Sequence, residues 1–156
     1  MARNQLTRAG YERLIAEHTN LSKSERPKVV QGITEAAAEG DLSENAEYTY
    51  GKKKLRELDK RIGYLAELLK EPIVVDPATL SGDKVQFGAT VVIEDEDGEQ
   101  KTWTIVGEGE ADVKERRISS GAPVAKALIG KTPGDLVEIK RPKGEIEVEI
   151  ISVTYK

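Results

Sequence analysis

Two segments with helical patterns are separated by the stretch Gly40-Asp41-Leu42-Ser43-Glu44-Asn45-Ala46-Glu47-Tyr48 (residues 40–48). Gly40 suits the end of the first helix, because glycine adopts the left-handed conformation without a steric penalty. If the two helices pack together, the chain reverses direction here and residues 40–48 form an exposed tip. This stretch therefore predicts an antiparallel pair of helices.

The two acids of the tip have a structural interpretation. Asp41 can cap the second helix with its carboxylate, and Glu44, three residues later, completes the spacing of a capping box. Capping boxes are common, so spacing alone favours this interpretation.

A second interpretation gives the same acids a chemical role. Carboxylates three residues apart in a first helical turn share a face, and the helix dipole favours their ionised form. Mg²⁺ usually takes one or two protein carboxylates and fills its other positions with water and phosphate. Asp41 and Glu44 therefore suit a metal site that another molecule completes.

Composition narrows the remaining possibilities. The chain has 156 residues, of which 38% are hydrophobic and 33% charged, as in one or two small folded domains. It has no cysteine and one histidine, which excludes disulfides, thiol nucleophiles and most zinc sites. No apolar run reaches the length of a membrane span, and residues 1–20 lack a signal-peptide pattern, so we expect a cytoplasmic protein without membrane contact.

The net charge of −4 is unevenly distributed. Residues 1–71 carry 13 Lys and Arg against 12 Asp and Glu, a net of +1, whereas residues 72–156 carry 11 against 16, a net of −5. Contact with nucleic acid must therefore come from a local basic patch rather than from the overall field.

The first helical pattern runs from Thr7, a candidate cap, to about Glu39. Pro27 has no amide hydrogen to donate inside a helix, so we expect a break or kink near Ser24–Pro27, with Ser24 capping the next segment.

The second helical pattern, residues 44–71, has the clearest periodicity in the chain. Its seam positions alternate spacings of three and four residues, as in a coiled coil: Tyr48, Gly51, Leu55, Leu58, Ile62, Leu65 and Leu69. One helix cannot bury this seam alone, so the first helix must be its partner. The second helix would extend roughly 42 Å at about 1.5 Å per residue.

A basic stripe follows the seam, with Lys52, Arg56 and Lys60 at four-residue intervals and Lys53 beside them. An ordinary solvated coiled-coil flank and a contact with phosphate are both open interpretations, although the excess of one sign favours phosphate. Tyr50 lies between the tip and this stripe in the sequence and is free to touch a base or a partner surface.

After Glu71-Pro72 the pattern changes to strands and turns. We expect one strand from Val85 to Ile93, a hairpin at Asp97-Gly98, a short helix over 123–129, and two further strands before the C-terminus. The apolar phase flips between Ile150 and Ile151, which predicts a β-bulge. The sequence thus divides into an α-helical coiled coil at 1–75 and a β-rich domain at 76–156, an α+β fold.

Several motifs together resemble the bacterial Gre transcript-cleavage factors, the GreA/GreB family. The resemblance rests on LTRAGY (6–11), ERP (25–27), GDLSENAEY (40–48), FGA (87–89), IVG (105–107) and ALIG (127–130). The basic segment 50–59 is more similar to the GreB branch, towards which we lean, whereas residues 107–112 are more similar to GreA.

The resemblance implies an antiparallel coiled coil followed by an FKBP-like antiparallel β domain, and a monomeric accessory factor rather than an enzyme. In the family, the globular domain docks on the rim of the RNA polymerase secondary channel, which would involve Pro123 here. The coiled coil reaches the active centre, where Asp41 and Glu44 would help the polymerase hold Mg²⁺ and cleave backtracked RNA.

The resemblance also assigns contacts beside the tip. Ser43 and Tyr50 would contact the channel or the RNA, and the RNA 3′ segment would lie near the basic residues Lys52, Lys53 and Arg56.

Two other functions remain alternatives at this point. One is an inhibitor that occupies the polymerase channel without cleavage, and the other is an FKBP-like chaperone or prolyl isomerase.

Overall fold

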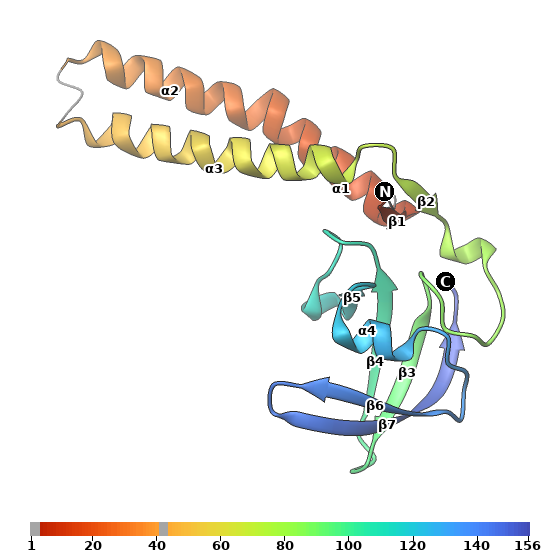
Figure 1. Ribbon diagram of the computed structural model, residues 1–156. Helices are drawn as coiled ribbons and strands as arrows, with labels where there is room; N and C mark the ends of the chain where they lie inside the picture. The colour runs from red at the N-terminus through yellow and green to blue at the C-terminus, as the bar shows by residue number, and fades with distance from the viewer. Residues whose placement is uncertain (1–3, 41–43) are drawn as a thin grey trace. The chain divides into compact units, whose positions relative to one another are not determined.

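The computed structural model describes residues 4–40 and 44–156, a mixed α+β protein with long N-terminal helices and a curled β-sheet (Figure 1). The chain forms two compact units. Glu12–Lys70 is one unit, which we call the helical hairpin, and the other, the β unit, joins Glu71–Lys156 to the N-terminal residues up to Tyr11. This division differs from the predicted boundary at residue 75, because the N-terminal strand pairs with the segment after the hairpin.

The helical hairpin consists of α1 (Arg8–Asn20), a short π-helix (Leu21–Glu25), α2 (Arg26–Ala38) and α3 (Ala46–Leu68). Helix α3 packs along α2 and runs in the opposite direction (Figure 1). The predicted pair of antiparallel helices is thus present, with α3 starting two residues later and ending three residues earlier than the predicted 44–71.

The helix does not break before Pro27, but the predicted segment does contain an irregularity, because the helix widens at Leu21–Glu25. The backbone stays in the right-handed helical region from Asn20 to Arg26, and Arg26 donates its amide to the Leu21 carbonyl in a π-type bond. Glu25, rather than Ser24, precedes α2, and Pro27 lies in the first turn of α2, directly after the widened turn.

The predicted seam of α3 is the less exposed side of the helix. Tyr48, Gly51, Leu55, Leu58 and Ile62 are half-buried, and Leu65 is fully buried. A pair of helices covers only part of each seam, because each helix has a single partner over most of its length.

The β unit is built on a five-stranded sheet in the order β5-β4-β3-β7-β6. Its strands are β3 (Thr90–Asp95), β4 (Gln100–Val106), β5 (Arg117–Ser119), β6 (Leu136–Arg141) and β7 (Gly144–Thr154). Helix α4 (Pro123–Leu128) contributes Ala125 and Leu128 to the core formed with strand residues such as Val91, Ile105 and Ile150. The sheet is mixed rather than purely antiparallel, since β5 runs parallel to β4.

The strand predictions are confirmed in part. The Asp97-Gly98 turn joins β3 to β4, and the predicted bulge is present, because Val92 pairs with Ser152 while Ile93 pairs with Ile150 and skips Ile151. The strand predicted from Val85 starts only at Thr90, because Gly88 adopts a φ of 90° in a turn before it. Val85 and Ala89 are nevertheless buried.

Two three-residue strands escaped prediction. β1 (Gln5–Thr7) pairs in parallel with β2 (Ile73–Val75), Leu6 opposite Val74. Both strands are too short for a periodic pattern. Within the described part of the chain, no helix combines the length and the apolar character that a bilayer span requires.

Candidate functional site on the helical hairpin

Asn45 closes the described end of the hairpin and links both helices. Its side-chain oxygen accepts a hydrogen bond of 3.0 Å from the Tyr48 amide, which caps α3. Its side-chain nitrogen donates 2.7 Å to the Ala36 carbonyl in the last turn of α2. One amide side chain thus satisfies a free donor of one helix and a carbonyl at the end of the other.

The capping-box interpretation of the tip acids is wrong, because the helix begins at Ala46 and its cap is Asn45. Glu44 precedes the cap instead of lying in the first turn, and its side chain is exposed. Asp41 and Ser43, the other predicted tip residues, lie outside the described residues. Glu44 is therefore not needed as a cap.

The predicted basic stripe lies on the outside of α3, where Lys52, Lys53 and Arg56 are all exposed. The Lys52 ammonium lies 5.4 Å from the centre of the Tyr48 ring, within range of a cation–π interaction. Among the residues that the structure describes, none of these three cations forms an ion pair with a carboxylate. Their charges are thus available to an external anion.

Arg61 directly follows Lys60 of the stripe in the sequence but has a different role. It forms two hydrogen bonds of 2.8 and 2.9 Å with the Glu17 carboxylate, which join α3 to α1. The hydrogen bond from Arg61 is the largest influence that lowers the pKa of Glu17, and burial opposes it.

Arg26 and Asp59 make a second cross-helix pair at 2.7 Å. Arg26 lowers the pKa of Asp59 in the same way, chiefly through the hydrogen bond. The sequence did not predict these pairs, although opposite charges flanking a seam could have suggested them.

Tyr50 lies on a groove between the helices rather than with the stripe. It is 68% exposed and lines this groove together with Gly51 and Lys54 of α3 and with residues of α2. Lys52 and Arg56 do not line it. The structure therefore separates Tyr50 from the basic residues with which it was grouped.

Pro123, the predicted docking residue, is the first residue of α4 in the β unit and is exposed. The preceding Ala122 is in an extended conformation and caps the helix with no side-chain hydrogen bond. A proline at this position favours the helix start, which is a complete structural explanation without a partner.

A buried carboxylate in the β unit escaped prediction. Glu110 is 5% exposed and accepts hydrogen bonds from the amides of Thr7 (2.9 Å) and Gly107 (2.8 Å) and from the Thr7 hydroxyl. The Thr7 hydroxyl in turn accepts from the Gly10 amide at 3.1 Å, as the expected cap of α1. A Cβ on Gly10 would collide with the Glu110 carboxylate, so that glycine is required for close packing.

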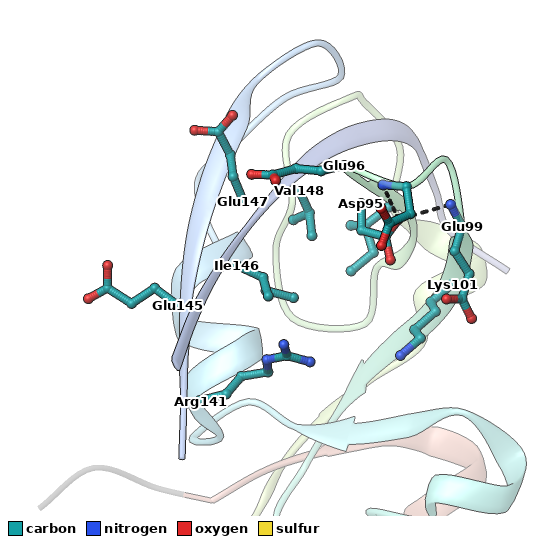
Figure 2. A pocket seen from close by; sticks show the side chains of 11 residues that line it. Asp95, Glu96, Glu99, Lys101, Arg141, Glu145, Ile146, Glu147 and Val148 are labelled. Carbon is teal, nitrogen blue, oxygen red and sulfur yellow. Dashed lines mark hydrogen bonds between the residues drawn. The ribbon is translucent and has the colours of Figure 1, made fainter. Parts of the chain in front are cut away.

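A pocket lined by several acidic side chains lies at one end of the sheet in the β unit (Figure 2). It has a volume of about 190 Å³, and Lys101 and Arg141 line it with several carboxylates. The Asp95 carboxylate accepts hydrogen bonds of 2.9 Å from the amides of Asp97 and Glu99, so it stabilises the β3–β4 turn. Figure 2 shows Glu145 pointing away from Arg141 and Lys101, so the charged side chains do not converge on one point.

The described residues contain no group of three or more His, Cys, Asp or Glu side chains arranged to hold a metal ion. Glu44 offers one exposed carboxylate with the hard oxygen ligands that Mg²⁺ prefers.

Comparison with known families covers both units. The family described as "Transcription elongation factor, N-terminal" matches residues 4–74, and "Transcription elongation factor, GreA/GreB, C-term" matches residues 80–155. Together these matches cover nearly the whole chain, which therefore belongs to the GreA/GreB family of transcription elongation factors.

Individual relatives agree with the family match. The chain is 49% identical to transcription elongation factor GreA of Chelativorans sp. (strain BNC1), with 96% of each chain covered. It is 47% identical to GreA of Anaeromyxobacter sp. (strain K), with 99% of this chain and 94% of the relative covered. The crystal structure of GreA factor homolog 1 (Gfh1) of Thermus thermophilus is 26% identical over 97% of this chain and 99% of that one, with a TM-score of 0.46.

The leaning towards the GreB branch is not supported, because these two sequence relatives carry the name GreA. The basic side chains of segment 50–59 are exposed on α3. Charge at such a position is weakly constrained by folding, so it is a poor marker of the branch.

Proposed function

We propose that this chain is a transcript-cleavage factor that stimulates the RNA cleavage activity of bacterial RNA polymerase. Membership of the elongation-factor family supports a role as an accessory factor rather than an enzyme. The observation that carries the cleavage role is the cap of α3. Because Asn45 performs the capping, the exposed Glu44 carboxylate beside it has no structural task and remains free for chemistry.

The shape of each unit suits this role. The half-buried seam of α3 supports a coiled coil that enters the secondary channel, and α3 alone has 23 residues, a reach of roughly 34 Å. The curled sheet with α4 against its core supports an FKBP-like docking domain. In this arrangement Pro123 contributes to docking on the channel rim, and one monomer acts on one polymerase in the cytoplasm.

Asp41 and Glu44 are the residues that would hold Mg²⁺ together with the polymerase. A second Mg²⁺ in phosphodiester hydrolysis activates water and stabilises developing charge. The two side chains supply anionic oxygen ligands, and the polymerase and RNA supply the others.

Lys52, Lys53 and Arg56 would hold the displaced RNA 3′ segment. Their exposure and lack of carboxylate partners among the described residues support contact with phosphates, which gives affinity without sequence preference. Ser43 would contact the channel or the RNA close to the tip.

The two alternative functions are less well supported. The family match does not favour a chaperone or prolyl isomerase. Relatives named transcription elongation factor GreA likewise do not favour a channel inhibitor.

The decisive experiment adds the purified chain to stalled, backtracked elongation complexes. We expect shortened RNA with new 3′ ends, and faster restart of synthesis. Unchanged RNA length at saturating protein, with polymerase binding intact, would identify a channel inhibitor instead. Charge reversal of Lys52, Lys53 and Arg56 should reduce cleavage of long backtracked segments more than short ones, and cleavage by the unmodified chain should fall more steeply than cleavage by the variant as salt rises.

A further inference from the structure

A groove runs along one flank of the helical hairpin, with a volume of about 410 Å³. We call it the flank groove. Val29, Gly32 and Ala36 of α2 line one side, and Tyr50, Gly51 and Lys54 of α3 line the other. Lys52, Lys53 and Arg56 are not part of it, so the hairpin has two chemically different sides.

Two glycines shape the flank groove in different ways. A Cβ on Gly51 would lie 2.8 Å from Cγ1 of Ile33, so this glycine lets the two helices approach closely. A Cβ on Gly32 would meet no atom within 4 Å. Gly32 therefore has no packing reason to be glycine, although glycine disfavours a helix interior. The space above it is open to another molecule.

The charges around the flank groove favour a cation. Its acids are Glu25, Glu35, Glu39 and Glu47, against Lys28 and Lys54. Among the described residues, Glu25, Glu39 and Glu47 form no ion pair, whereas Glu35 accepts a hydrogen bond of 3.1 Å from Gln31. The resulting net charge of −2 would repel an RNA phosphate.

Tyr50 supplies the recognition element for such a cation. Its side chain is 68% exposed and lines the groove. An arginine guanidinium stacks well on a tyrosine ring and forms hydrogen bonds to carboxylates at the same time. A groove with one aromatic wall and an acidic rim suits this side chain.

We propose that the flank groove receives an arginine-bearing segment of a protein partner. The inference rests on the proposed function, which makes this partner the protein wall of the RNA polymerase channel. The hairpin then uses its basic stripe for RNA and its opposite flank for protein. Tyr50 accordingly contacts protein rather than RNA.

The first test is a photocrosslinking experiment with the full chain bound to backtracked RNA polymerase complexes. A photoreactive phenylalanine replaces Tyr50 in one variant and Lys53 in another. We expect position 50 to crosslink to a polymerase subunit, at a site containing arginine, and position 53 to crosslink to RNA. A position 50 adduct that is mainly RNA would overturn the proposal.

The second test fills the groove and uses a matched control. Gly32→Leu places a side chain in the flank groove, whereas Gly63→Leu makes the same change in α3, where a Cβ also meets no atom within 4 Å and no groove residue is altered. Both changes improve helix propensity, so both variants should fold and melt no earlier than the original chain. We expect Gly32→Leu alone to weaken polymerase binding, on the order of tenfold, as loss of a central contact does.

Equal polymerase affinity of the two leucine variants would overturn the proposal. The proposed function is judged separately, from RNA shortening by the unmodified chain. If the unmodified chain shortens RNA but the groove variants behave alike, only the groove assignment fails. If the unmodified chain neither binds polymerase nor shortens RNA, both fail.

Discussion

In the β unit, a core of apolar side chains from the sheet and α4 is almost completely buried, whereas most seam residues of the helical hairpin are half-buried. Leu128 and Ile150 have no exposed surface, but Leu55 and Leu58 remain partly open to solvent. Cross-helix contacts such as Arg26–Asp59, Glu17–Arg61 and the Asn45 bridge support the hairpin. The β unit is thus organised by its interior, and the hairpin by contacts near its surface.

This difference predicts where function and stability can be separated. Exposed hairpin side chains without a cross-helix contact, such as Glu44 and Lys53, should contribute little to folding, so their loss should affect activity first. Core side chains of the β unit should show the opposite behaviour.

The largest expected effect on activity comes from the tip. Asp41→Asn and Glu44→Gln each remove an anionic ligand, and stimulated cleavage should fall by about a hundredfold, since a catalytic metal contributes several kcal/mol. Measurement of RNA cleavage rates checks this, with polymerase affinity and melting temperature expected to stay unchanged.

Magnesium titration provides the control for the tip variants. Higher Mg²⁺ should partly restore cleavage if a ligand has been lost. Cleavage at the original rate in both amide variants, or a loss that tracks unfolding, would contradict the metal assignment.

The largest expected effect on stability comes from the β core. Leu128→Ala should lower the free energy of unfolding by about 2–5 kcal/mol, because it leaves a cavity in a fully buried site. The half-buried Leu55→Ala should cost clearly less. Denaturant unfolding measures the free energy of unfolding of both variants. Equal losses in Leu128→Ala and Leu55→Ala would contradict the expected difference between the two units.

Asn45 should give an intermediate effect, because it stabilises the base of the tip. Asn45→Ala removes the cap of α3 and the bond to Ala36, and should cost about 1 kcal/mol or more. Asn45→Asp is the matched control, since it keeps the acceptor for Tyr48 but cannot donate to Ala36. Thermal melting together with cleavage assays should place Asn45→Asp between the alanine variant and the original chain.

The smallest expected effect is a pH dependence from the Glu17–Arg61 pair. The pKa of Glu17 in the folded state lies below its ordinary value of 4.5, so the ion pair with Arg61 stabilises the fold above that pH. The contribution should disappear as pH falls through the lowered pKa, and it should amount to less than about 1 kcal/mol because the pair is near the surface. Unfolding curves of the original chain and Glu17→Gln should converge in acid; a constant difference at all pH values would contradict this assignment.

The sequence by itself determined the features that repeat along the chain. The seam from Tyr48 to Leu69 predicted the second helix, and the phase change at Ile150 and Ile151 predicted the bulge, because both rest on local periodicity. The motif at 40–48 identified the tip and the family resemblance. These signals do not depend on which segments meet in space.

Only the tertiary structure showed which side chains cap a helix, form buried hydrogen bonds or line a groove. Asn45 caps α3, in place of the predicted capping box of Asp41 and Glu44. The helix continues through Pro27, and the turn before it is π-helical. The tertiary structure also buried Glu110 against the amides of Thr7 and Gly107, and placed Tyr50 on the flank groove instead of the basic stripe. Such partners are distant in sequence or depend on the exact residue where a helix begins, so spacing alone leaves them undetermined.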